Sequence, residues 1–156
     1  MKYLLNFKSI IKIKLCILFY IKQNNKIYIY ILMEVVYTKE APDAIGPYSQ
    51  AYKANGFVFT SGQIAINPAN GNVEETTIEG QTEQVMKNLG AVLKAAGSSF
   101  EKTVKTVCFL ADMNDFGKFN AIYGKYFTSK PARSCVAVKT LPKNVLVEVE
   151  CVALAN

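Results

Sequence analysis

The chain has 156 residues, of which 51% are hydrophobic and 19% charged, and its formal net charge is +6 at pH 7. Histidine is absent, which excludes Ser-His and Cys-His nucleophile pairs, histidine-ligated zinc and imidazole acid–base chemistry. Its four cysteines show no CxxC spacing, which is typical of reduced thiols in an intracellular protein. Any catalysis therefore uses carboxylates, tyrosine, a thiol, backbone amides or water.

The positive charge is confined to the start of the chain. Residues 1–33 carry six lysines and no acid, whereas the rest carries twelve basic and twelve acidic residues. A neutral domain lacks the basic surface that supplies most non-specific nucleic-acid affinity, so the basic composition is no evidence for an RNA or DNA partner.

Residues 1–33 are interpreted as a leader outside the fold, and residues 34–156 as one domain. Twenty-eight of the first 33 residues are Ile, Lys, Leu, Tyr, Asn or Phe, residues with AT-rich codons, so we favour a translated upstream stretch with Met33 as the working start. A transit peptide is the second interpretation, because acids are absent. A membrane anchor is the third, since the longest uncharged runs have seven residues and a spanning helix needs about 20. The expected location is the cytoplasm, or a mitochondrion or other organelle if the leader is a transit peptide, with no membrane partner.

Strand signals begin directly after Met33. Residues 35–37 are a short strand candidate, and the two prolines in residues 41–47 predict a loop. Residues 51–54 and 57–64 are predicted to form a hairpin, because Asn55-Gly56 between them favours a tight β-turn.

The second half of the chain mixes helices and strands. Apolar residues at three- and four-residue steps predict an amphipathic helix from Ile78 to Ala96, ended by Gly97. Asp115 opens a shorter helix that is rich in aromatic residues. The remaining strands are predicted over residues 104–110, 134–138 and 146–154. This order predicts an α+β fold in which a single mixed or antiparallel sheet carries two helices on one face.

The final strand has apolar residues on both of its sides. Val147, Val149 and Cys151 alternate with Glu148 and Glu150, and the second set continues with further apolar residues. Two apolar sets favour an oligomer, because helices cover only one sheet face.

Arg133 is the only arginine and follows Pro131 within an apolar strand. A guanidinium in this setting is suited to bind a carboxylate or phosphate through two parallel hydrogen bonds. The alternative is a structural ion pair with a nearby acid, and Glu148 and Glu150 share one face of the last strand.

Four other features are candidates, each with a structural alternative. Tyr48 lies in a proline-containing loop and is either a presented phenol or a packed turn residue. Ser61-Gly62 ends a strand, where the glycine either lets a ligand approach the backbone N–H groups or marks a β-bulge. Asn120 lies within a helix and needs a hydrogen-bond partner, and Cys135 shares a strand face with Arg133.

Taken together in this order, the motifs resemble the Rid (YjgF-type) family of reactive intermediate imine deaminases. They are the runs Ala41-Pro42-Asp43-Ala44-Ile45-Gly46-Pro47-Tyr48-Ser49-Gln50-Ala51, Thr60-Ser61-Gly62-Gln63-Ile64, Gln81-Thr82 with Asn88-Leu89, Asp112-Met113-Asn114-Asp115-Phe116 with Asn120 and Tyr123, Pro131-Ala132-Arg133-Ser134-Cys135, and Leu141-Pro142 to Glu148-Val149-Glu150. The resemblance covers residues 34–156.

The resemblance implies a homotrimer with clefts between subunits and a fold similar to chorismate mutase of the bacterial trimeric type. It implies a 2-imino acid substrate, such as 2-iminobutanoate or 2-iminopropanoate, or its enamine tautomer. Arg133 would hold the substrate carboxylate and Glu148 would hold the attacking water. Pocket positions are implied for Tyr48, Ser61, Gly62, Asn120 and Cys135.

This chemistry needs neither a cofactor nor a metal. An already electrophilic C=N carbon requires a positioned water, and a carboxylate can orient that water and pass its proton to departing ammonia. Two other activities stay open: an endoribonuclease or translation inhibitor, against which the neutral domain and lone arginine argue, and a ligand-binding regulatory trimer without turnover, which would need Arg133 but not Glu148.

Overall fold

The computed structural model describes residues 19–23, 26–30 and 33–155, which belong to two units, Met1–Leu32 and Met33–Asn156. In the first unit β1 (Phe19–Gln23) pairs antiparallel with β2 (Lys26–Tyr30). The sequence analysis assigned no element there, although isoleucine and tyrosine around Asn24-Asn25 are a hairpin signal. Most of the residues on which the interpretation of the leader depends lie outside the described ranges. Within those ranges, no helix is long and apolar enough to cross a membrane.

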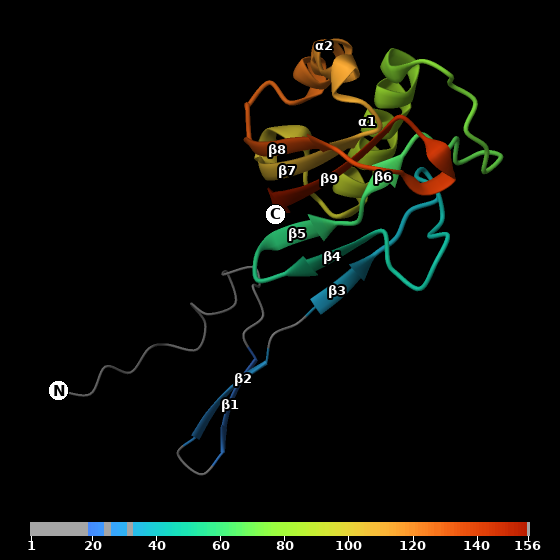
Figure 1. Ribbon diagram of the computed structural model, residues 1–156. Helices are drawn as coiled ribbons and strands as arrows, with labels where there is room; N and C mark the ends of the chain where they lie inside the picture. Colours follow the sequence, from blue (N-terminus) through green and yellow to red (C-terminus); the bar gives the residue numbers. More distant parts are fainter. Residues whose placement is uncertain (1–18, 24–25, 31–32, 156) are drawn as a thin grey trace. The chain divides into compact units, whose positions relative to one another are not determined.

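The second unit is one mixed sheet with two α-helices (Figure 1). Its elements are β3 (Met33–Val36), β4 (Ala51–Ala54), β5 (Phe57–Thr60), β6 (Gln63–Ile64), α1 (Ile78–Ala95), η2 (Phe100–Lys102), β7 (Thr103–Leu110), η3 (Met113–Asp115), α2 (Phe116–Tyr126), β8 (Ala132–Ala137), η4 (Pro142–Asn144) and β9 (Val147–Leu154). The strand order is β3-β4-β5-β9-β7-β8, with β6 beside β9. The β7–β8 pair is parallel and the other pairs are antiparallel, which confirms the predicted sheet class.

The hairpin predicted at Asn55-Gly56 is present. Both residues have left-handed backbones, with φ of 50° and 79°, as a two-residue type I′ turn requires. The long strand predicted over residues 57–64 is wrong, because β5 ends at Thr60 and β6 begins at Gln63. Ser61 continues the β4–β5 pairing by one residue, since its backbone N–H donates to the Gln50 carbonyl at 2.9 Å, and its hydroxyl donates to the Ser49 carbonyl at 2.6 Å.

The two ends of α1 follow the predicted signals. The Thr77 side chain accepts a hydrogen bond from the Gly80 N–H at 3.1 Å, which satisfies one of the helix's unpaired donors. At the other end Gly97 has a φ of 72°, and its N–H donates to the Lys94 carbonyl. This left-handed glycine closes the helix where the sequence predicts.

Both helices pack on the same face of the sheet (Figure 1). On β9, Val147, Val149, Cys151 and Ala153 are buried against them, while Glu148 and Glu150 point to the other, open face. The open face also exposes large apolar side chains: Val35, Tyr52, Phe57, Phe59, Val136 and Leu154. The two-sided apolar pattern predicted for the last strand therefore extends over the sheet.

Candidate active site

A pocket lies on the open face of the sheet beside β9. Its lining comprises Ile45, Tyr48, Ser61, Gly62, Ile64, Pro142, Glu148 and Glu150, and its volume is about 350 Å³. This volume is within the range of small-molecule sites. Four residues predicted for the site, Tyr48, Ser61, Gly62 and Glu148, are thus brought together from a loop, a strand junction and β9.

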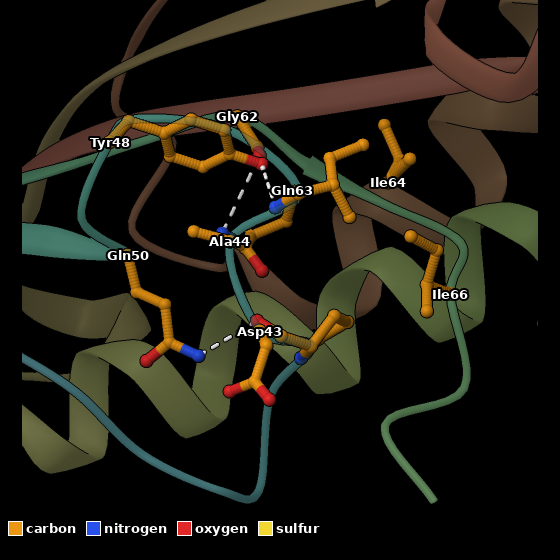
Figure 2. A pocket seen from close by; sticks show the side chains of 10 residues that line it. Asp43, Ala44, Tyr48, Gln50, Gly62, Gln63, Ile64 and Ile66 are labelled. Carbon is orange, nitrogen blue, oxygen red and sulfur yellow. Dashed lines mark hydrogen bonds between the residues drawn. The ribbon is translucent and has the colours of Figure 1, made fainter. Parts of the chain in front are cut away.

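The loop that carries Tyr48 is held by the buried side chain of Gln50 (Figure 2). The Gln50 amide nitrogen donates to the carbonyls of Thr38 at 3.0 Å and Pro42 at 2.8 Å, and its oxygen accepts from the Thr38 N–H at 2.7 Å. The Tyr48 hydroxyl accepts from the Ile45 N–H at 3.3 Å. Because the phenol oxygen acts as acceptor there, its own proton remains available to a ligand in the pocket.

Gly62 is needed because the Glu148 side chain occupies the space that a larger residue would fill. A methyl group at Gly62 would overlap the Oε1 atom of Glu148, and it would lie only 2.7 Å from Cδ and 2.9 Å from Cγ. Here the close approach is made by a side chain of the chain itself, whereas the sequence suggested a ligand. Gly62 therefore leaves the space in which the carboxylate of Glu148 lies.

Glu148 is half-buried and stands next to a second carboxylate on the same strand face. Burial raises the pKa of Glu148, and the charge of Glu150 raises it further, because both disfavour the ionised form. A carboxylate with a raised pKa accepts a proton more readily than an ordinary one, which suits a group that orients water and moves its proton.

Two side chains of α1 hold the strands around the pocket. The Asn88 amide donates to the carbonyls of Ile64 at 2.9 Å and Ile66 at 2.8 Å. The Gln81 amide oxygen accepts from the Leu146 N–H at 2.7 Å, directly before β9. Both residues belong to the motifs of the sequence analysis, which gave them no role. The structure shows that they fix β6 and the start of β9 to the helix.

Arg133 lies elsewhere, on the helix side of the edge strand β8. One guanidinium N–H donates to the Asn120 side-chain oxygen at 2.7 Å. The guanidinium also lies over the rings of Phe116, Phe119 and Tyr123, at 5.4, 5.9 and 4.8 Å from their centroids. Among the described residues, no carboxylate forms an ion pair with Arg133. The structural ion pair considered from the sequence is therefore absent from the described residues.

Arg133 and Glu148 project from opposite faces of the sheet. Arg133 is the register partner of Thr106, which is fully buried under the helices, whereas Glu148 faces the open side. The strands β8 and β9 are also not neighbours, because β7 pairs with both. The two residues are therefore separated by a strand as well as by the sheet itself. Arg133, Asn120 and Cys135 do not line the pocket that contains Glu148.

Cys135 lies next to a second thiol. It is the register partner of Cys108 on β7, and the two side chains interact. Burial raises the pKa of Cys135, against a smaller opposing effect of Arg133, and burial raises the pKa of Cys108 to about 12. Neither thiol is activated as a nucleophile. In the part of the chain that the structure describes, no group of three His, Cys, Asp or Glu residues could hold a metal ion.

The fold and the site define a small α+β domain with an acidic pocket on one sheet face. At the sheet edge it carries a guanidinium that forms no ion pair within the described part of the chain. The family described as Endoribonuclease L-PSP matches residues 38–155. The chain belongs to this family, which also carries the names Rid and YjgF.

Similar proteins carry several functional names. The putative regulator AldR of Lactococcus lactis is 53% identical over 122 residues, which cover 78% of this chain and 97% of that protein. The 2-iminobutanoate/2-iminopropanoate deaminase of Mus musculus is 45% identical over 125 residues, which cover 80% of this chain and 93% of the relative. The structure of E. coli TdcF with bound serine is 37% identical, covers 79% of this chain and 99% of that chain, and has a TM-score of 0.75.

Proposed function

We propose that this protein hydrolyses small 2-imino acids, such as 2-iminobutanoate and 2-iminopropanoate, and their enamine tautomers. Water adds to the C=N carbon, the C–N bond breaks, and a 2-keto acid and ammonia are released. The observation that carries the proposal is the half-buried carboxylate of Glu148 in a pocket of ligand size. Arg133 adds a guanidinium that has no acidic partner among the described residues. The names of the mouse relative and of the similar proteins from Homo sapiens and Arabidopsis thaliana, which are also called deaminases, support the same chemistry.

Arg133 is proposed to bind the substrate carboxylate. Its planar fork still has N–H groups available after the bond to Asn120, and two parallel charge-assisted bonds fix both the position and the plane of a carboxylate. Serine bound to E. coli TdcF is likewise a small ligand that bears a carboxylate.

Glu148 is proposed to hold the attacking water and to transfer its proton to the departing nitrogen. The raised pKa of this carboxyl brings its proton affinity closer to that of the groups it must exchange with. Tyr48 and Ser61 complete the wall on which the imine lies, and Gly62 leaves room for the carboxylate. Cys135 lies beside Arg133 and is proposed to contribute shape rather than reactivity.

The proposed reaction needs a second copy of the chain. A substrate cannot touch Arg133 and Glu148 of one subunit, because they project from opposite sheet faces. The exposed apolar open face offers the surface on which copies would meet. We therefore propose a homotrimer in which Arg133, Asn120 and Cys135 of one subunit complete the pocket formed by Tyr48, Ser61, Gly62 and Glu148 of the next.

The test is hydrolysis of freshly generated imine. A threonine dehydratase produces 2-iminobutanoate in the presence of the protein, and 2-ketobutyrate is followed against the spontaneous rate. The protein should accelerate its appearance, and Glu148→Gln, which has nearly the same shape, should lose about 10²- to 10⁴-fold of the rate. Structured and single-stranded RNA are incubated in parallel. RNA cleavage without imine hydrolysis would favour the endoribonuclease, and binding of 2-ketobutyrate without turnover would favour a regulatory trimer.

A further inference from the structure

One face of α2 contacts the guanidinium of Arg133. Phe116, Phe119, Asn120 and Tyr123 follow a spacing of three, four and seven residues, so they share that face. All four contact Arg133, Asn120 by a hydrogen bond and the other three through their rings. We call the rings of Phe116, Phe119 and Tyr123 the aromatic cradle.

Tyr123 is the member of the cradle that is tied to the sheet. Its ring is the nearest of the three to the guanidinium, at 4.8 Å, and its hydroxyl is 2.8 Å from the hydroxyl of Thr106. Both residues are buried, and Thr106 is the register partner of Arg133 on the neighbouring strand. The ring of Tyr123 therefore contacts the guanidinium, while its hydroxyl is bonded to the strand next to Arg133 through Thr106.

This arrangement restricts a side chain that is otherwise flexible. An unrestrained arginine loses rotamer freedom when it is fixed by a ligand. Ring faces attract the flat guanidinium electrostatically, and Asn120 occupies one of its N–H groups. The plane of the fork is thereby set before a carboxylate arrives, which lowers the entropic cost of binding it.

We propose that the aromatic cradle, with Tyr123 as its principal positioning residue, pre-orients Arg133 for the carboxylate of the substrate. This inference rests on the proposed function, since it takes the Arg133 ligand to be the carboxylate of a 2-imino or 2-keto acid. Tyr123 touches neither the substrate nor the reacting carbon, so its effect appears in binding and leaves the chemical step unchanged.

The structural alternative is that Tyr123 only fills the core. Its ring stacks on Phe127 at 4.5 Å, and Phe127 is also buried. Among the described aromatic rings, only the three of the cradle lie over Arg133, so Phe127 shares the packing role without the contact. Phe127→Leu is therefore the matched control for Tyr123→Leu.

The experiment titrates the full-length variants with 2-ketobutyrate, a stable keto acid with the same carboxylate, by calorimetry, and records their melting temperatures and their kcat and KM for the imine. Tyr123→Leu should weaken 2-ketobutyrate binding roughly 5- to 30-fold and raise KM similarly, with kcat within about threefold of the parent. Tyr123→Phe keeps the ring and should restore most of the affinity. Phe127→Leu should lower the melting temperature as much as Tyr123→Leu does, with unchanged affinity.

Equal affinities of Tyr123→Leu and Phe127→Leu would overturn the inference. If Tyr123→Leu does not fold, the same titration is made with Phe116→Leu, which removes a half-buried ring of the cradle; unchanged affinity there also overturns it. Arg133→Ala separates this inference from the proposed function. Undiminished 2-ketobutyrate binding by Arg133→Ala would refute the carboxylate role of Arg133 itself, whereas loss of binding in Arg133→Ala but not in Tyr123→Leu would refute the cradle alone.

Discussion

Gly62→Ala is the substitution whose effect follows most directly from the geometry. The backbone conformation at position 62 is compatible with alanine, because Gly62 is not among the residues with a left-handed φ. Its obstacle is the Glu148 side chain, whose Cδ and Cγ would lie 2.7 and 2.9 Å away. The carboxylate must therefore leave its present position for the methyl group to fit.

The size of the effect can be worked from these contacts. Ordinary carbon contacts begin near 3.4 Å, so the carboxyl carbon must retreat by about 0.7 Å and the overlapping Oε1 atom by more. Misplacing a catalytic group by about 1 Å costs on the order of 10²-fold in rate. We expect Gly62→Ala to retain about 1 to 10% of the parent kcat for the imine. Folding should be preserved, because alanine at a compatible backbone position restricts the unfolded chain and stabilises by about 0.4–1 kcal/mol.

The assay compares the appearance of 2-ketobutyrate from dehydratase-generated imine with thermal melting of the same samples. Gly124→Ala is the control, since a methyl group there meets nothing within 4 Å and replaces a glycine inside α2, so activity should stay at the parent level. Full activity of Gly62→Ala would show that the position of the Glu148 carboxylate is not what limits turnover, and the role assigned to Glu148 would be lost.

Four further outcomes are expected. Arg133→Lys keeps the charge but loses the planar fork, and kcat/KM should fall roughly 10- to 150-fold, mainly through KM, in steady-state kinetics. Turnover should decline as the pH falls through the raised pKa of Glu148. Because the folded state disfavours the ionised form of Glu148, Glu148→Gln should melt at a higher temperature than the parent near pH 7. This difference in melting temperature should shrink as the pH falls below the pKa of the folded state and vanish below the ordinary pKa of 4.5. Cys135→Ser should change kcat little, since burial raises the pKa of this thiol; its complete inactivation would point to covalent thiol catalysis. A chain beginning at Met33 should match the full chain in solubility and activity, and failure of this shorter chain to fold would contradict the interpretation of residues 1–32 as dispensable.

Local signals in the sequence were sufficient to predict most helices and strands of the second unit. The Asn55-Gly56 turn, the glycine that ends α1 and the shared strand face of Glu148 and Glu150 each depend on a few neighbouring residues. The β1–β2 hairpin was missed even though its signal was local, because the leader was judged by its composition alone.

What the sequence could not provide were relations between distant segments. The insertion of β7 between β8 and β9 depends on a crossover through α2, and no local pattern determines which strand lies at the sheet edge. For the same reason the opposite projection of Arg133 and Glu148 was not predicted. The contact of Gly62 with Glu148 joins residues far apart in the chain, and its only sequence signal was a glycine at a strand end.

The central claim, that the site is assembled from two copies of the chain, is tested most directly by mixing two inactive variants. Arg133→Ala and Glu148→Gln are co-expressed in equal amounts and purified as mixed oligomers. In a trimer that contains both variants, about one boundary in three joins an intact Arg133 to an intact Glu148. Recovery of about a third of the parent activity toward 2-iminobutanoate is therefore expected. Activity no higher than that of the separate variants, in oligomers shown to contain both, would contradict it.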